Sequence, residues 1–176
     1  MVDIHGGPRR IVALACAVAL ALTLTACGGD DDPAPGPSEP TTAAPVDEAT
    51  EAFEDYWAVY VQMANSGEIS PRGFDGVADG VFLETVLKAL TEQADSGVVR
   101  VGEPDFGDFS TTVTDGTASS VVCRDDSQWG AKHDGELIEE SVSQTPRPRP
   151  YVGTLELRGD RWVVTNVELA EGIACP

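Results

Sequence analysis

Basic residues are scarce in this sequence. Lysine and arginine together number 11 among 176 residues, against 30 aspartates and glutamates, and the formal net charge is −19 at pH 7. Proteins that bind nucleic acids obtain most of their affinity from clustered lysines and arginines that face the phosphates. The composition therefore argues against nucleic-acid binding, and we expect no nucleic acid among the partners.

Histidine and cysteine are also rare, with two and four copies. Zinc sites need several closely spaced histidines and cysteines, and phosphate-binding loops need grouped glycines. Neither pattern occurs, because the histidines are far apart and the 18 glycines are scattered. We therefore expect no metal and no cofactor.

A hydrophobic run long enough for a membrane-spanning helix is missing as well. The apolar run at residues 11–24 follows Arg9 and Arg10. As a helix it would reach about 21 Å, whereas the hydrocarbon core of a bilayer is roughly 30 Å thick. A basic segment followed by a short apolar run is typical of a signal peptide.

The residues Leu24-Thr25-Ala26-Cys27, directly after that run, resemble the bacterial lipobox. The resemblance implies that a lipoprotein signal peptide, residues 1–26, is removed and that Cys27 is lipidated. The protein would then be exported and anchored by lipid to the extracytoplasmic face of the cell membrane. The alternative is an ordinary signal peptide in which Cys27 has no special role.

Replacement of Cys27 tests the anchor. We expect Cys27→Ala to release the mature chain from membranes, because the acceptor of the lipid is lost. Fractionation of cells that express the variant measures this. A processed chain that stays in the membrane fraction would refute the anchor.

Residues 27–46 are too poor in large apolar side chains to fold. They hold five prolines and an acidic triplet: Pro33, Pro35, Pro37, Pro40, Pro45 and Asp30-Asp31-Asp32. Proline-rich chain extends by about 3.1 Å per residue, so a disordered tether of this length spans up to roughly 60 Å. Residues 47–176 are left as a single domain.

Cys123 and Cys175 are the only cysteines that could pair after export, since Cys27 carries the lipid. Exported proteins occupy an oxidising environment. We therefore predict a disulfide between them, the alternative being two separately buried thiols.

Periodicity divides the domain into helices followed by strands. Apolar residues at three- and four-residue steps predict a helix around residues 53–64 and a second one at 81–94, between Asp79 as N-cap and Gly97. From Val98 onward the period is two. The sequence predicts turns at Asp115-Gly116, at residues 132–135 and at residues 158–160, and a strand at residues 136–142. In the last predicted strand, Trp162 and Val164 lie on one face, and Val163 and Val167 lie on the other.

This order favours an α+β fold in which two N-terminal helices pack on a curved antiparallel sheet. Together with the closing segment YVGTLELRGDRWVVTNVE, it resembles the NTF2-like (SnoaL-like, cone-shaped) superfamily over residues 46–169. With the lipobox and the segment VVCRDDSQW, the chain is similar to actinobacterial exported lipoproteins of unknown function that carry such domains. A cystatin-like sheet around one helix is the structural alternative.

The resemblance implies an interior that in related enzymes holds an acid or base, often beside a tyrosine. No catalytic motif of the family maps onto this chain. Tyr56 and Tyr60 are candidates, but the sequence favours packing with the hydroxyl at the rim for both. Asp125 or Asp126 can lie at a strand end near the mouth. His133 falls in a predicted turn, which favours an exposed loop histidine.

We expect a non-catalytic binding or scaffolding module of the cell envelope. The aromatic residues form a candidate pocket for an apolar small ligand: Tyr56, Trp57, Tyr60, Phe82 and Trp162. Because aromatic stripes more often fill a core, the sequence favours an envelope protein partner that docks on a surface such as the loop of Arg147 and Arg149. A carrier of that small ligand, or a ketosteroid isomerase-like enzyme with an inward acid, is the alternative.

Overall fold

The structure, a computed structural model, describes residues 44–175, which belong to one compact unit. The signal peptide, Cys27 and nearly all of the expected tether lie outside these residues, so those expectations stay predictions.

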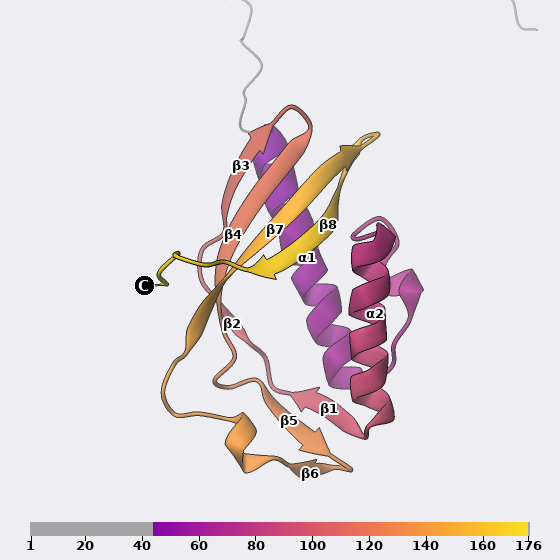
Figure 1. Cartoon of the computed structure of the whole chain (residues 1–176), viewed down its shortest axis with the longest axis vertical. Helices are drawn as coiled ribbons and strands as arrows, with labels where there is room; N and C mark the ends of the chain where they lie inside the picture. The colour runs from indigo at the N-terminus through magenta and orange to yellow at the C-terminus, as the bar shows by residue number, and fades with distance from the viewer. Residues whose placement is uncertain (1–43, 176) are drawn as a thin grey trace, which may run out of the picture. The chain divides into compact units, whose positions relative to one another are not determined.

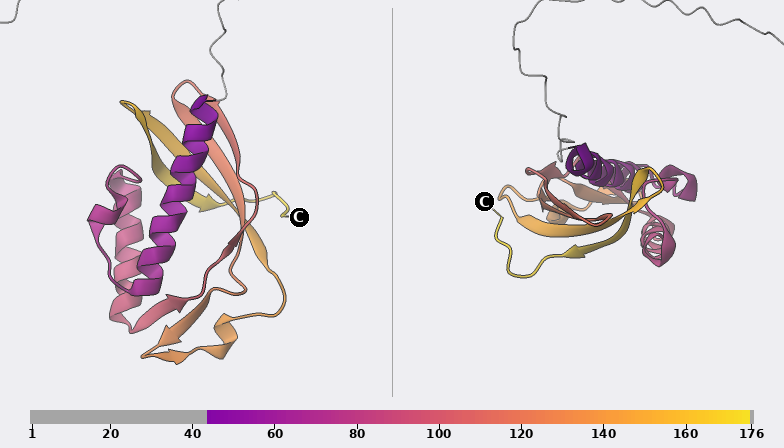
Figure 2. Two further views of the ribbon diagram at one scale, coloured as in Figure 1. Left: turned by 180° about the vertical axis from the view of Figure 1, so that it is seen from behind. Right: turned by 90° about the horizontal axis from the view of Figure 1, so that it is seen from above.

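Helix α1 (Ala44–Ser66) begins three residues before the expected domain start at residue 47 and ends before Gly67. Phe53, Tyr56 and Trp57 recur along one side of it at helical spacing, and all three are buried. Figure 2 shows this helix lying along one face of the large sheet. The predicted aromatic stripe is therefore the side of α1 that faces the sheet.

Helix α2 (Gly80–Asp95) follows a short 3₁₀ helix, η1 (Pro71–Phe74). Leu90 is its only fully buried residue, so α2 packs more loosely than α1. Asp79 occupies the predicted N-cap position, but its carboxylate makes no capping bond and instead forms an ion pair with Arg158. Among residues 44–175, no helix combines the length and apolarity needed to cross a membrane.

The strands form two antiparallel sheets, where the sequence analysis expected one (Figure 1). The smaller sheet has the order β1-β5-β6, and the larger has the order β2-β4-β7-β8, with β3 paired to β4. Their bounds are β1 (Val98–Val101), β2 (Asp105–Phe106), β3 (Ser110–Thr114), β4 (Thr117–Asp125), β5 (Gly130–His133), β6 (Glu136–Leu137), β7 (Pro148–Arg158) and β8 (Arg161–Leu169).

All three predicted turns are present and each joins neighbouring antiparallel strands. Asp115-Gly116 joins β3 to β4, and both residues have positive φ, 48° and 77°. Two-residue turns with positive φ match the twist of a hairpin, which is why Asp-Gly is favoured there. Asp134-Gly135 joins β5 to β6 in the same way, and Gly159-Asp160 joins β7 to β8.

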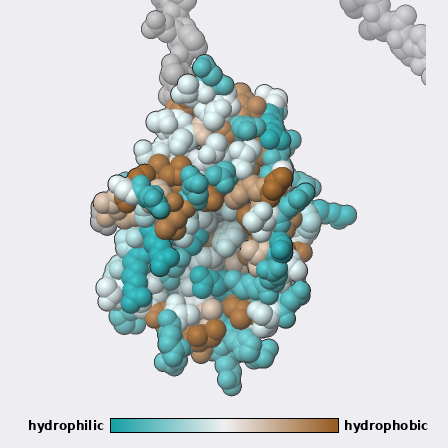
Figure 3. All heavy atoms as spheres, viewed as in Figure 1, coloured by the Kyte–Doolittle hydropathy of each residue, from teal (hydrophilic) through white to brown (hydrophobic). Residues whose placement is uncertain are grey.

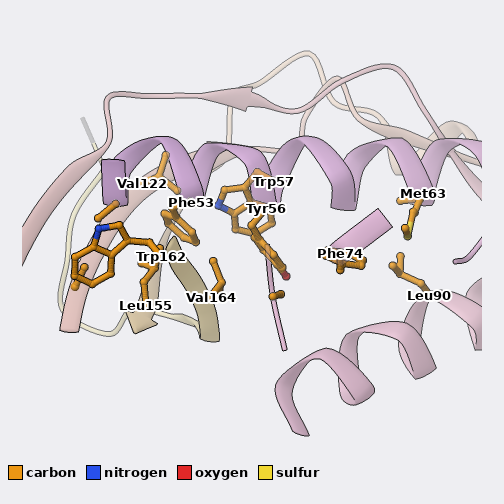
Figure 4. Close-up of a cluster of buried hydrophobic side chains, with 14 of the residues drawn as sticks. Phe53, Tyr56, Trp57, Met63, Phe74, Leu90, Val122, Leu155, Trp162 and Val164 are labelled. Atoms are coloured by element: carbon orange, nitrogen blue, oxygen red, sulfur yellow. The ribbon is translucent and has the colours of Figure 1, made fainter. Parts of the chain in front are cut away.

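The core lies between α1 and the larger sheet (Figure 4). Phe53 meets the sheet at Gly153 of β7, where a Cβ atom would lie 2.5 Å from the Phe53 ring. Glycine at this position lets the ring contact the strand backbone. Val122, Leu155 and Val164 surround the same contact and are fully buried.

Two details of the strand prediction are wrong. The predicted strand 136–142 ends at Leu137, and a 3₁₀ turn, η2 (Glu139–Ser141), follows because the Ser141 hydroxyl bonds the Ile138 carbonyl locally at 2.5 Å. The face assigned to Val167 is also reversed. A β-bulge shifts the register of β8, so that Val164 lies opposite Leu155 while Val167 lies opposite Gly153, both on the inner face.

The predicted disulfide is confirmed. Cys123 of β4 and Cys175 of the C-terminal tail are bonded, with Cα atoms 5.7 Å apart. Ala170 begins this tail by donating its backbone N–H to the Pro150 carbonyl at 2.9 Å. The α+β fold with two helices packed on antiparallel sheets is confirmed as well.

Candidate functional site

A pocket of about 590 Å³ opens between α1, α2 and the larger sheet. Figure 3 shows a hollow near the centre of the drawn face. The pocket is lined by Tyr56, Trp57, Tyr60, Val81, Phe82, Thr85, Val86, Ala89, Arg124, Tyr151, Thr165, Asn166 and Val167.

The α1 wall of the pocket is aromatic. Tyr56 and Tyr60 are one helical turn apart, and their rings lie 6.1 Å apart at an interplanar angle of 28°. Trp57 packs edge-on against Tyr56 and Tyr60, at 5.2 and 5.7 Å between ring centres. These rings both complete the core and border the pocket, so one stripe serves both purposes.

The α2 wall is apolar and more open. Val81, Phe82 and Val86 supply most of its surface, and Val81 is 78% exposed. Since α2 contributes only Leu90 to the fully buried core, this wall is the less firmly packed side of the pocket.

Arg124 is the charged group of the pocket and is only 7% exposed. Its Nε lies 2.7 Å from Oδ1 of Asp126, and its Nη2 donates to Oδ2 of Asp126 at 2.8 Å. Nη2 also donates to the Tyr151 hydroxyl at 3.0 Å. One charge-assisted hydrogen bond through Nη2 and one close ion contact through Nε hold the guanidinium against the carboxylate.

Aromatic rings hold the same guanidinium from several sides. Its central carbon lies 4.4 Å from the ring centre of Tyr151, 4.7 Å from that of Trp57 and 5.3 Å from that of Trp129. Cation–π contact compensates part of the hydration that a buried arginine loses. Arg124 is thus rigidly placed before any ligand arrives.

Burial keeps the pocket tyrosines protonated. Desolvation raises the pKa of Tyr56 well above its ordinary value, and the nearby Tyr60 raises it further, while Arg124 opposes both. Desolvation likewise raises the pKa of Tyr60. Both phenols are therefore hydrogen-bond donors at neutral pH.

The structure separates the five residues of the candidate pocket. Tyr56, Trp57, Tyr60 and Phe82 line the pocket together, whereas Trp162 borders a different, smaller cavity of about 220 Å³. That cavity is lined by Glu48, Glu51, Ala52, Asp55, Gly76, Val77, Asp160, Arg161 and Trp162.

Neither candidate aspartate is a free acid inside the pocket. Asp126 pairs with Arg124, and Asp125 accepts hydrogen bonds from the backbone N–H groups of Ser127 and Arg147 at 2.8 and 3.0 Å. Desolvation alone would raise the pKa of Asp125, but these hydrogen bonds outweigh it and lower the pKa. His133 ends β5 with its side chain 56% exposed.

The loop of Arg147 and Arg149 lies away from the pocket lining. Pro148 and Pro150 pair with β4 opposite Asp125 and Cys123, while the pairing of β7 with β8 spans Tyr151 to Arg158. Pro148 and Pro150 therefore lie beyond the pairing of β7 with β8, where the Pro150 carbonyl accepts the Ala170 N–H. Such a position at the end of the pairing tolerates residues without an N–H donor. Both arginines are exposed.

Sequence reasoning missed Arg124 and Tyr151. The signal for Arg124 was present, because Ser120, Val122 and Arg124 alternate along β4 and all three are buried. A charged residue in register with an apolar strand face points inward, where it needs partners. Asp126, two residues further on, is that partner.

Chemically, the pocket suits binding. Within residues 44–175 no group of three or more histidine, cysteine or acidic side chains is placed to hold a metal. The polar side chains that line the pocket include three phenols, a guanidinium and one tryptophan, with Thr85, Thr165 and Asn166 beside them. The Tyr151 phenol already accepts a hydrogen bond from Arg124, whereas the buried Nε1 of Trp57 has no partner among the described residues.

No protein-family model and no curated protein sequence matches this chain. Among solved structures, it is similar to the Kfla4162 protein of Kribbella flavida, with 14% identity over 74% of this chain and 93% of that one and a TM-score of 0.48. The intermembrane space region of the chloroplast protein ARC6 has 14% identity over 70% and 95%, with a TM-score of 0.45. A protein with the name Rd1NTF2_05 and five substitutions has 10% identity over 68% and 97%, with a TM-score of 0.41. Since identity is at most 14% in these three, the function proposed for this chain rests on its own residues.

Proposed function

We propose that this protein is an exported, membrane-anchored binding module of the cell envelope, with an NTF2-like domain whose pocket holds an apolar small molecule without transforming it. The single observation that carries the proposal is the aromatic-walled pocket of about 590 Å³. Ligand sites are typically concave, mostly apolar and supplied with a few fixed polar groups. The pocket has all three properties.

The engagement of the neighbouring acids supports binding over catalysis. Proton transfer requires a group that can accept or release a proton close to the ligand. Asp126 is held by Arg124, and Asp125 is held by the backbone of residues 127 and 147. The raised pKa values of Tyr56 and Tyr60 also keep both phenols protonated, so neither offers a phenolate that could accept a proton.

The sequence alone favours a partner docked on the Arg147 and Arg149 loop, because aromatic stripes commonly fill cores. The open pocket beside Tyr56 and Tyr60 now supports the small-ligand alternative. Pro148 and Pro150 have a structural explanation in their pairing with β4, so their presence adds no support for a binding role of that loop.

Filling the pocket tests the proposal. Ala89 lines the α2 wall and is exposed, so Ala89→Trp adds an indole at the pocket without disturbing the core. We expect it to weaken binding of 2-ethylnaphthalene at least about tenfold, since a buried ring loses its contacts. Equilibrium dialysis with the full chain measures this.

Glu84→Trp is the matched control, because Glu84 is exposed on the same helix but does not line the pocket. It should bind the probe as the unsubstituted chain does. Equal binding by all three proteins would show that the probe is taken up elsewhere, and the proposed function would then be rejected.

A further inference from the structure

We propose that the pocket selects ligands that carry a neutral carbonyl group at one end of an apolar body, with the carbonyl oxygen held by Tyr56, Tyr60 and Arg124. This inference rests on the proposed function and adds the ligand's polar group to it. Its basis is an excess of fixed hydrogen-bond donors at one wall of the pocket.

Arg124 contributes the first donor. Its Nη2 donates to Asp126 and to Tyr151, its Nε lies against Asp126 in an ion contact without a hydrogen bond, and no hydrogen bond among the described residues uses Nη1. The two N–H groups of Nη1 therefore remain available on a guanidinium that three aromatic rings hold in place. Because Arg124 lines the pocket, a ligand oxygen can reach it there.

Tyr56 and Tyr60 contribute the next two donors. Both line the pocket, and neither hydroxyl makes a hydrogen bond with any residue between 44 and 175. Figure 4 shows the Tyr56 hydroxyl pointing away from the axis of α1. Tyr56 as a residue is only 2% exposed, but its hydroxyl is not among the fully buried polar atoms that lack a partner. The hydroxyl is therefore accessible from the pocket, where a ligand acceptor can take its hydrogen bond.

The charge balance favours a neutral acceptor. Asp126 already neutralises Arg124 through two short contacts, so a carboxylate ligand would bring an unbalanced negative charge into a mostly apolar site. A ketone, ester or amide oxygen accepts the same hydrogen bonds and carries no net charge to desolvate.

The opposite wall defines the rest of the ligand. Val81, Phe82 and Val86 of α2, with Val167 of β8, offer side chains without hydrogen-bonding groups. A ligand that directs its oxygen toward α1 and β4 therefore lays its apolar body against α2 and the end of β8. Planar bodies also match the stacked rings of Tyr56 and Tyr60.

Three probes of similar shape separate these features: 2-acetylnaphthalene, 2-ethylnaphthalene and 2-naphthoate. The full chain is compared with Tyr56→Phe and Tyr60→Phe, which keep the rings that the core needs. We expect each substitution to weaken 2-acetylnaphthalene about three- to tenfold and to leave 2-ethylnaphthalene within about twofold. A ¹³C label on the ketone should show a downfield carbonyl shift on binding that shrinks in both variants.

Thr85→Val is the matched control, because Thr85 lines the pocket but its hydroxyl already bonds the Val81 carbonyl at 2.9 Å. It should leave the ratio of the two affinities unchanged. If both tyrosine variants also leave that ratio unchanged, or if 2-naphthoate binds more tightly than the ketone, this inference is overturned while the pocket keeps its proposed function. If 2-ethylnaphthalene and the ketone both fail to bind, the proposed function fails and this inference fails with it.

Discussion

Replacing both Cys123 and Cys175 by alanine is expected to lower the free energy of unfolding by about 4 kcal/mol. The bond closes a segment with a sequence separation of 52, and the unfolded chain without it gains the corresponding freedom. Denaturant unfolding of the double variant and of the oxidised chain measures the difference. For a domain of this size, that loss is a large part of the total stability.

Reduction of the unsubstituted chain is the control for that experiment. Reduced and doubly substituted chains should unfold at the same denaturant concentration, since both lack the same link. A double variant that is as stable as the oxidised chain would contradict the prediction. Peptide mapping without reductant checks independently that Cys123 and Cys175 are joined in the purified protein.

Adjacent residues of β4 serve opposite sides of the sheet. Cys123 is bonded to the C-terminal tail, whereas Arg124 is buried on the inner side and lines the pocket. Strand side chains alternate, so the sheet itself separates the stabilising bond from the binding site. Loss of the disulfide should therefore lower stability far more than it changes the geometry around Arg124.

Much of the fold could be predicted because its signals are local. Asp115-Gly116 has backbone angles that few other residue pairs adopt readily, and the tight hairpin follows from them. The stripe of Phe53, Tyr56 and Trp57 has the spacing of one helix face, so its burial could be expected before its partners were known.

The rest depends on contacts between distant segments. The register of β8 changes at a bulge opposite Thr154 and Leu155, and nothing in the local alternation of apolar residues announces it. The pocket is equally non-local. Tyr56 belongs to the core and also borders an open space, because α2 contributes only Leu90 to the fully buried residues. Periodicity does not encode how closely α2 packs against α1.

The site was predicted in part for the same reason. Tyr56, Trp57, Tyr60 and Phe82 share the pocket because two helices bring them together, as their helical spacing suggested. Trp162 belongs to another cavity because β8 carries it to the far end of α1, near Glu48 and Glu51. Arg124 was overlooked because charged residues usually face water.

The contact between Phe53 and Gly153 gives the second large expected effect. Phe53→Ala should lower the free energy of unfolding by about 3–5 kcal/mol, because Phe53 is fully buried and its removal leaves a cavity beside β7. Chemical denaturation measures the change. Val81→Ala is the control, since Val81 is 78% exposed and its truncation should change stability by less than about 0.5 kcal/mol.

The reciprocal substitution tests whether Gly153 is present for that ring. A Cβ at residue 153 would lie 2.5 to 2.9 Å from three atoms of Phe53, so Gly153→Ala should destabilise the domain by about 1–3 kcal/mol through overpacking. In the Phe53→Leu background the added methyl has more room, and its effect should shrink by at least about 1 kcal/mol. Strictly additive effects would show that Gly153 is required for a reason other than the Phe53 ring. A coupling of the expected sign would show that the helix side chain and the strand glycine act as one packing unit, which sets how closely α1 approaches the sheet.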